Sequence, residues 1–214
     1  MADVTAPQQL PRGRHGLTRD QVEIDQRLRI FLGMAEAMGE GGYVRTPVAE
    51  IIRRAGVSRE TFYQMYPDKL ASFLAAFDLV GEVLLERLGT SLAEPGEPIE
   101  RFERAVDAYL DTLASEPGYA RLFLVEVHAA GPEAMARRAV IQRRIVDALV
   151  DLLDVRSDAG RFTCQMLVAA VSAMVTGPLV AGDLDALRAL APPILDHVRR
   201  LEAAGMFDPP SAQP

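Results

Sequence analysis

Residues 46–69 read TPVAEIIRRAGVSRETFYQMYPDK, and this stretch decides the fold of the N-terminal part of the chain. Thr46 predicts the cap of a helix that begins at Pro47, where a missing N–H leaves no hydrogen bond unmade. Gly56 is suited to the left-handed conformation that turns the chain. Ser58 then predicts the cap of a second helix. The stretch therefore predicts two short helices joined by a tight turn.

The second of these helices is expected to bury one side and to present hydrogen-bonding groups on the other. Val57 and Phe62 stand at the spacing of a hydrophobic staple around Ser58. Pro67 is expected to stop the helix, and Asp68 to cap the next one. The outward face combines guanidinium, carboxylate, hydroxyl, phenol and amide groups, from Arg59, Glu60, Thr61, Tyr63 and Gln64. Such a face is suited to the major groove of DNA.

A further helix is expected upstream of this pair. Thr18 and Gln21 form a capping-box pattern, and apolar residues then follow at helical spacing until Gly39 and the glycine pair after it. Residues 1–16 are rich in Pro, Gln, Gly and Arg, which predicts a flexible arm. The two arginines of this arm, Arg12 and Arg14, either reach DNA, as N-terminal arms do, or belong to a solvated tail.

The remainder of the chain also predicts helices, because its apolar residues recur at helical spacing and strand-like alternation is scarce. Asp68 begins a helix that runs to about Thr90. The later helices are expected over 98–115, 117–130, 132–155, 160–181 and 184–204. The Pro192-Pro193 pair should kink or split the last helix. We therefore predict an all-α fold of about nine helices, in which a three-helix helix-turn-helix domain (17–69) precedes a larger helical domain (70–205) and a flexible tail (206–214).

Composition and charge narrow the class of protein. The 214 residues have the apolar and charged fractions of a soluble globular protein, and the single cysteine, Cys164, fits a reducing cytoplasm. Residues 1–69 hold 10 basic and 9 acidic side chains, whereas residues 70–214 hold 13 and 21. An acidic protein binds DNA when the acid lies away from the contact face, and this asymmetry permits that arrangement.

The stretch from Phe162 to Gly182 contains no charged residue and is long enough to raise the question of a membrane span. It also contains Gln165, Ser172 and the Gly177-Pro178 pair, which disfavour a span. A helix buried in a protein interface is the simpler interpretation, and no membrane partner is expected.

The motifs of the N-terminal part carry a family resemblance. AGVSRETFYQMYPDK, preceded by GGYVRTPVAEII, resembles the DNA-binding domain of TetR-type (TetR/AcrR) transcriptional regulators over about residues 18–75. GRHGLTRDQ (13–21) and ARLFLVEVHAAGPEA (120–134) resemble an actinobacterial branch. The resemblance implies that residues 17–69 bind DNA. It also implies that residues 70–205 enclose a small-molecule pocket and form a homodimer through the last two long helices. Most members are repressors that a ligand releases from DNA.

The resemblance also assigns roles to individual residues. Arg59, Glu60 and Thr61 match the base-reading start of the recognition helix. Tyr63 and Lys69 match residues that contact the DNA backbone, and Thr46 matches a helix cap that also touches a phosphate. There are two departures: Met65 stands where histidine is frequent, and Leu70 stands where an acidic residue is common. Glu60 is better explained by favourable charge at a helix N-terminus. For Arg59, a phosphate contact or a solvated charge explains the residue as well as base reading does.

Two further groups of residues are candidates in the larger domain. The pocket candidates share helical spacing on the middle helices, where ordinary core packing is the alternative: Phe102, Val106, Tyr109, Leu113, Phe123, Val127, His128, Met135, Met166 and Val171. The dimer candidates combine small residues with an apolar stripe on the last helix: Ala169, Ala170, Ala173, Gly177, Leu187, Leu190, Ile194, Leu195, Val198 and Leu201.

The sequence thus predicts a cytoplasmic, homodimeric repressor that binds a near-palindromic duplex operator and is released by a small apolar ligand. The alternatives are a ligand-responsive activator and a helical interaction module without DNA binding. An enzyme is disfavoured, because the histidines are scattered and no metal, cofactor or paired-carboxylate motif appears.

Overall fold

The computed structural model describes residues 18–207, which are helical and include no strand. The predicted arm (1–16) and the tail from residue 208 onward lie outside the described residues. The chain divides into two compact units, of which the first ends at Ala76 and the second begins at Phe77. This boundary lies inside the long helix α4, Lys69–Ala93, whereas the sequence predicts a boundary at residue 70.

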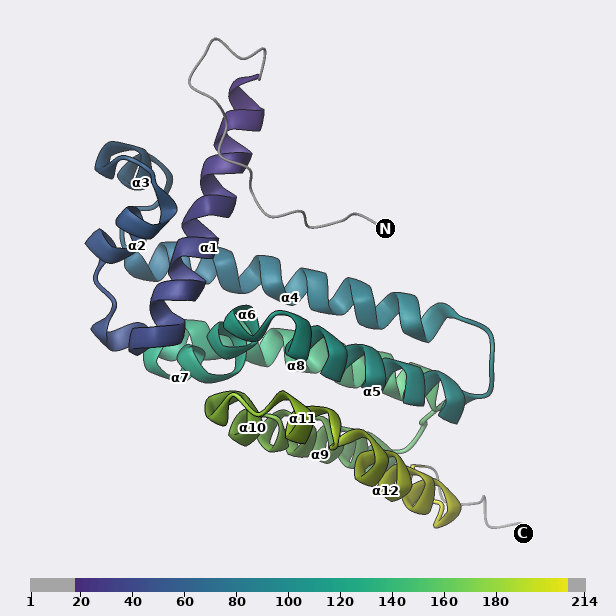
Figure 1. The fold of residues 1–214 in the computed structure, drawn as a ribbon. Helices are drawn as coiled ribbons and strands as arrows, with labels where there is room; N and C mark the ends of the chain where they lie inside the picture. Colours follow the sequence, from purple (N-terminus) through teal and green to yellow (C-terminus); the bar gives the residue numbers. More distant parts are fainter. Residues whose placement is uncertain (1–17, 208–214) are drawn as a thin grey trace. The chain divides into compact units, whose positions relative to one another are not determined.

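The first unit consists of α1 (Arg19–Arg45), α2 (Val48–Ala55), α3 (Arg59–Met65) and the beginning of α4 (Figure 1). Helix α2 packs directly against α1 at Gly33, where an added Cβ would lie 2.7 Å from the backbone nitrogen of Ala55. The core of the unit is formed by side chains with almost no exposed surface: Ile30, Met34, Met38, Ile51, Phe62 and Phe73.

Local hydrogen bonds confirm the predicted starts of three helices. Thr18 and Gln21 form the capping box of α1. The Ser58 hydroxyl accepts from the backbone N–H of Thr61, and the Asp68 carboxylate accepts from the backbone N–H of Ala71. Gly56 adopts the left-handed conformation, at φ 62° and ψ 31°. These elements form as predicted because each depends on residues within one turn of it.

One predicted detail of this unit is confirmed and another is wrong. Helix α1 breaks at Gly42 (φ 74°, ψ 164°), within the predicted glycine pair, and helical residues continue beyond this bend to Arg45. Thr46 does not cap α2, whose N-cap residue is Pro47. The Thr46 hydroxyl instead donates to the carbonyl oxygens of Ala37 (3.2 Å) and Gly42 (2.8 Å), so it closes the preceding helix. The bend at Gly42 brings these carbonyl oxygens within hydrogen-bond distance of the buried Thr46 hydroxyl.

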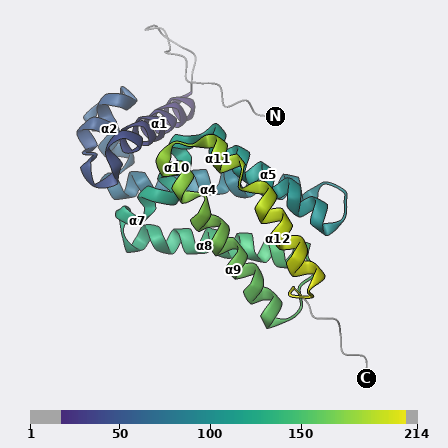
Figure 2. The same cartoon turned by 60° about the horizontal axis from the view of Figure 1, so that its bottom comes forward.

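The second unit contains the rest of α4 and the remaining helices. Their bounds are α5 (Pro98–Ser115), α6 (Pro117–Arg121), the π-helical turn η1 (Leu122–Glu126), α7 (Val127–Ala130), α8 (Pro132–Leu152), α9 (Asp158–Met174), α10 (Thr176–Ala181), α11 (Leu184–Arg188) and α12 (Ala191–Ala203). Helix α9 packs on α8, and α11 and α12 pack on α5 (Figure 2).

The described residues form the nine predicted helices when adjoining short segments are counted together, because three of the predicted helices are divided in the structure. The span 117–130 comprises α6, η1 and α7, and the π-helical turn within it carried no sequence signal. The span 160–181 is interrupted at Val175, which separates α9 from α10. The last predicted helix splits into α11 and α12 just before Pro192-Pro193, as expected. The all-α prediction is confirmed.

The beginning of the predicted flexible tail is a further correction. Thr163 donates from its hydroxyl to the carbonyl oxygen of Met206, at 3.1 Å. Phe207 is buried, and its backbone lies against Gly160 on α9. Because Gly160 has no side chain, the backbone of Phe207 can pack directly on α9 at this point.

Candidate DNA-binding surface and ligand cavity

Helix α3 is held by its inner face. Phe62 is fully buried, and its ring lies 5.9 Å from that of the buried Tyr66. Arg29 of α1 donates to the carbonyl oxygen of Gly56 at 3.4 Å, which ties α1 to the turn before α3. The turn and the buried aromatic side chain together fix which side of α3 faces outward.

The outer face of α3 carries the predicted DNA-reading groups. Arg59, Glu60, Tyr63 and Gln64 are all exposed. The Arg59 guanidinium lies 5.4 Å from the centroid of the Tyr63 ring, and Gln64 donates to the Glu60 carboxylate at 3.2 Å. Thr61 is half-buried, with its hydroxyl 2.8 Å from that of Ser58. These contacts hold the polar side chains beside one another on the outer face of α3.

Lys69 and Thr46 brace the connection between α1 and α2. The Lys69 ammonium donates to the carbonyl oxygens of Tyr43 (2.7 Å) and Thr46 (3.1 Å) and lies 4.1 Å from the centroid of the Tyr43 ring. Burial lowers its pKa. An ammonium has three donors, so one remains for a phosphate. Thr46 is only 2% exposed and its hydroxyl is already bonded, which contradicts the predicted phosphate contact of its side chain.

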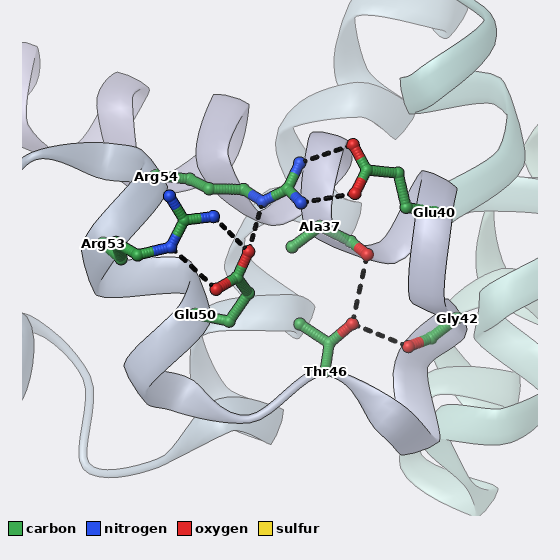
Figure 3. A network of polar contacts seen from close by, with 7 residues as sticks. All are labelled: Ala37, Glu40, Gly42, Thr46, Glu50, Arg53 and Arg54. Carbon is green, nitrogen blue, oxygen red and sulfur yellow. Dashed lines mark hydrogen bonds and ion pairs between the residues drawn. The ribbon is translucent and has the colours of Figure 1, made fainter.

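Four charged side chains form a network on α1 and α2 (Figure 3). Arg54 donates to both carboxylate oxygens of Glu40, at 2.9 and 2.5 Å, and to Glu50 at 2.7 Å. Arg53 donates to both oxygens of Glu50. These hydrogen bonds, that from Arg53 first, lower the pKa of the Glu50 carboxyl to about 2. Both arginines therefore have carboxylate partners, so α2 adds little unpaired positive charge.

A cavity of about 160 Å³ lies within the second unit. Its lining is mostly aliphatic and comes from α4, α5, η1, α8 and α9: Leu84, Leu85, Leu88, Gly89, Leu92, Phe102, Ala105, Val106, Tyr109, Phe123, Leu124, Arg138, Ile141, Gln142, Ile145, Ala148, Leu149, Leu167, Val168, Val171 and Ser172. Among these, Arg138 has the only charged side chain, and it is 9% exposed.

The cavity includes half of the predicted pocket residues, namely Phe102, Val106, Tyr109, Phe123 and Val171. The other five lie elsewhere: Leu113 and Val127 are buried in the core, Met135 and Met166 are exposed, and His128 is exposed but lies 2.6 Å from Arg138. Helical spacing identifies an apolar face but not the neighbour that it packs against, which is why the prediction failed for these five.

Sequence reasoning missed the contributions of α4 and α8. Leu84 and Leu88 belong to a stripe that the sequence shows, but nothing in that stripe distinguishes cavity from core. The sequence could have identified Arg138 as a buried arginine, because it stands four residues from Ala134 and three from Ile141, on an apolar helix face. Burial lowers the pKa of Arg138 and raises that of the neighbouring Tyr109.

Helices α9 and α10 present an apolar face to the outside of the second unit. Phe162 is 60% exposed and Met166 is 57% exposed. Further along the same helices, the small predicted interface residues Ala169, Ala170, Ala173 and Gly177 are also exposed. The opposite face, which includes Cys164 and Leu167, is buried in the unit. By length and composition alone, Asp158–Ala181 would suffice to cross a membrane.

The predicted apolar stripe of the last helix faces inward instead. Leu187, Ile194 and Val198 are buried within the protomer, which corrects their assignment to a dimer surface. Leu190, Leu195 and Leu201 are half-buried. The stripe packs inside the unit, and α11 and α12 lie on α5, so charged side chains such as Arg200 form the exposed side of α12.

Comparison with known proteins supports the helix-turn-helix assignment. Residues 33–76 match the family model of bacterial regulatory proteins, tetR family. The HTH-type transcriptional activator FasR of Mycolicibacterium smegmatis is 26% identical over 164 residues, which are 77% of this chain and 71% of FasR. The nucleoid occlusion factor SlmA of Haemophilus influenzae is 26% identical over 120 residues, 56% of this chain and 51% of SlmA.

Solved structures share the fold of most of the chain. The transcriptional regulator FadR from Bacillus subtilis, in complex with stearoyl-CoA, is 18% identical with a TM-score of 0.70, over 79% of this chain and 95% of FadR. The fatty acid degradation regulator FadR from Bacillus halodurans is 18% identical with a TM-score of 0.68, over 78% and 95%. The regulators among these relatives are not enzymes.

Proposed function

We propose that this transcriptional regulator of the TetR family works in the cytoplasm as a homodimeric repressor, which a small apolar ligand releases from a near-palindromic operator. The observation that carries the proposal is the outer face of α3. Exposed Arg59, Tyr63 and Gln64 project from a helix whose other side is fixed by the fully buried Phe62. A major groove requires this combination of rigidity and exposed polar groups.

Within this surface, we assign different tasks to different side chains. Arg59, Glu60 and Thr61 stand at the start of α3 and are proposed to meet base edges, where a guanidinium can contact O6 and N7 of guanine. Tyr63 and the free donor of Lys69 are proposed to contact phosphates, which position the helix without specifying sequence.

A homodimer is supported by the apolar outer face of α9 and α10. Large side chains such as Phe162 and Met166 are exposed there beside alanines that permit close helix approach. A second copy of the chain would cover this face and would place two recognition helices on one operator. Two-fold symmetry requires half-sites about one helical turn apart or somewhat more. Insertion into lipid is the competing use of the same face, and α9 opposes it because its inner side packs on α8.

A ligand is supported by the cavity and by the relative that was solved with stearoyl-CoA. The aliphatic lining suits the hydrocarbon part of a ligand. Ligand binding would shift the equilibrium between DNA-binding and released states by its difference in affinity for the two. Activation is the second candidate function, because the relative FasR is named an activator.

The proposal is tested with duplex fragments from around the protein's own gene. We expect specific binding whose affinity falls steeply as salt rises, because phosphate contacts release counterions. Tyr63→Ala should weaken binding to all sequences alike, whereas Arg59→Ala should relax the preference at one base position by about 1–3 kcal/mol. Arg143→Met, an exposed change on α8, is the control. Absent or salt-independent binding to every fragment would refute DNA regulation. Transcription from the best site in vitro then distinguishes repression from activation.

A further inference from the structure

The cavity has one polar end within an otherwise apolar lining. Arg138 and Gln142 lie one turn apart on α8, so both side chains project from the same face. Tyr109 of α5 and Ser172 of α9 line the cavity with them. The opposite end is formed by hydrocarbon side chains, such as those of Leu92, Phe102 and Leu149.

Arg138 is a buried cation that has hydrogen-bond partners for only some of its nitrogen atoms and no carboxylate partner among the described residues. Its Nη2 donates to the Ser172 hydroxyl at 2.8 Å, and its Nη1 lies 2.6 Å from Nε2 of His128. Its Nε is buried without a hydrogen-bond partner. Among residues 18–207, no carboxylate forms an ion pair with it. A buried charge without a counter-ion is unfavourable unless something else neutralises it.

Two neutral polar groups that line the cavity with Arg138 also lack a hydrogen-bond partner among the described residues. Neither the Tyr109 hydroxyl nor the Gln142 amide forms a hydrogen bond with another described residue. Tyr109 is close enough to Arg138 for the positive charge to act on its hydroxyl. Arg138 and Tyr109 therefore offer a guanidinium N–H and a phenol close together, and Gln142 adds an amide to the same cavity one turn along α8. Such donors are those that a carboxylate accepts.

We propose that the cavity binds a single-chain amphiphile that ends in a carboxylate, with the carboxylate on Arg138 and Tyr109 and the hydrocarbon chain along the leucines of α4. This inference rests on the proposed function, in which the cavity is the ligand site. The ligand supplies the negative charge that the protein does not, so binding neutralises the buried guanidinium. A neutral alcohol or an acyl thioester would present uncharged oxygen there and would leave the cation unpaired.

The cavity also limits the length of the chain. Along α8, the rise from Arg138 to Leu149 is about 16 Å at 1.5 Å per residue. An extended chain advances roughly 1.2 Å per bond, as a fully extended backbone covers about 3.5 Å in three bonds. About a dozen carbon atoms therefore span this distance.

The test is isothermal titration of the full chain with dodecanoate, 1-dodecanol and dodecanoyl-CoA. Dodecanoate and dodecanoyl-CoA are kept below their micelle-forming concentrations, and dodecanol below its solubility limit. We expect dodecanoate to bind roughly 10- to 100-fold more tightly than the other two, the range for hydrogen bonds to a charged group. Arg138→Met should remove this preference while it keeps or improves binding of the alcohol. Arg143→Met, an exposed arginine on the same helix, should leave the preference unchanged.

Two further variants keep the test decisive if Arg138→Met does not fold. Tyr109→Phe removes one donor and should weaken dodecanoate binding roughly 3- to 10-fold, with no effect on the alcohol. Ala148→Phe fills the apolar half of the cavity and should prevent binding of both. Retained binding of dodecanoate by Ala148→Phe would place the site elsewhere and overturn the inference.

The remaining outcomes separate this inference from the proposed function. Equal binding of dodecanoate and dodecanol by the wild type, or tighter binding of the thioester, would overturn the carboxylate assignment while an apolar ligand stands. A preference that persists in Arg138→Met or in Tyr109→Phe at full strength would also overturn it, as would no binding of any probe. Failure of the ligand-free protein to bind DNA would count against the proposed function alone.

Discussion

Replacement of Gly33 by alanine probes the contact on which the first unit depends. An added Cβ would lie 2.7 Å from the backbone nitrogen of Ala55 and 3.1 Å from the backbone carbon of Arg54. These are main-chain atoms of α2, so the helix itself must move. Overpacking of this kind costs about 1–3 kcal/mol. The same change at Gly39, on the same helix, meets no atom within 4 Å and is the matched control.

The two variants share their effect on helix propensity, since each replaces a helical glycine with alanine and gains about 1 kcal/mol from it. The difference between them therefore isolates the clash. We expect Gly39→Ala to be more stable than the wild type, and Gly33→Ala to be about 1–3 kcal/mol less stable than Gly39→Ala. This corresponds to roughly a 5- to 150-fold change in the local unfolding equilibrium.

Hydrogen exchange of α1 and α2 amides in the full chain is the suitable assay, because the two units need not unfold together. Operator affinity provides a second measurement. Movement of α2 would also move the turn at Gly56, whose carbonyl Arg29 holds, and with it α3. We expect weaker DNA binding by Gly33→Ala only. Equal protection in the two variants would refute the direct contact between α1 and α2.

Two other predictions concern charge and assembly. The Glu50 pKa of about 2 lies below its ordinary value of 4.5, so the stability that its ion pairs contribute is complete above pH 4.5 and is lost as pH falls toward 2. Titration of the carboxyl by NMR should give a pKa near 2 in the wild type and a higher pKa in Arg54→Gln. An unshifted pKa in both proteins would contradict the network. If the proposed homodimer forms, Met166→Glu should give a monomer in sedimentation without loss of helix content, because the change buries a charge in the proposed interface. Glu202→Gln on α12 should leave the sedimentation unchanged, and a Met166→Glu variant that sediments as a dimer would show that α9 is not the interface.

The local structure of the candidate DNA-binding surface was largely predictable from the sequence because its signals are local. Ser58 caps α3 through a hydrogen bond three residues away, and helical geometry turns Tyr63 about 100° away from the buried Phe62. The role of Thr46 was not predictable in this way. Its hydroxyl bonds to Ala37, nine residues earlier, and that contact exists only because α1 bends at Gly42.

The cavity was predictable only in part, for a related reason. Phe102, Val106 and Tyr109 were recognised because they share one face of one helix. Met135 and Met166 have the same spacing but lie outside, since a helix in a layered bundle has more than one apolar side. Arg138 gained its importance from Ser172, which is 34 residues away in the chain and 2.8 Å away in the fold.

By itself, the sequence determined the all-α class, three of the helix caps, the left-handed turn at Gly56 and the polar face of α3, because each depends on residues within about one turn. The tertiary structure alone decided that Thr46 and Lys69 brace the connection between α1 and α2, and that Leu187 and Val198 face inward. It also decided that Arg138 is buried in an aliphatic cavity without a counter-ion among the described residues. These properties depend on which helix faces meet, and packing between distant segments sets that choice.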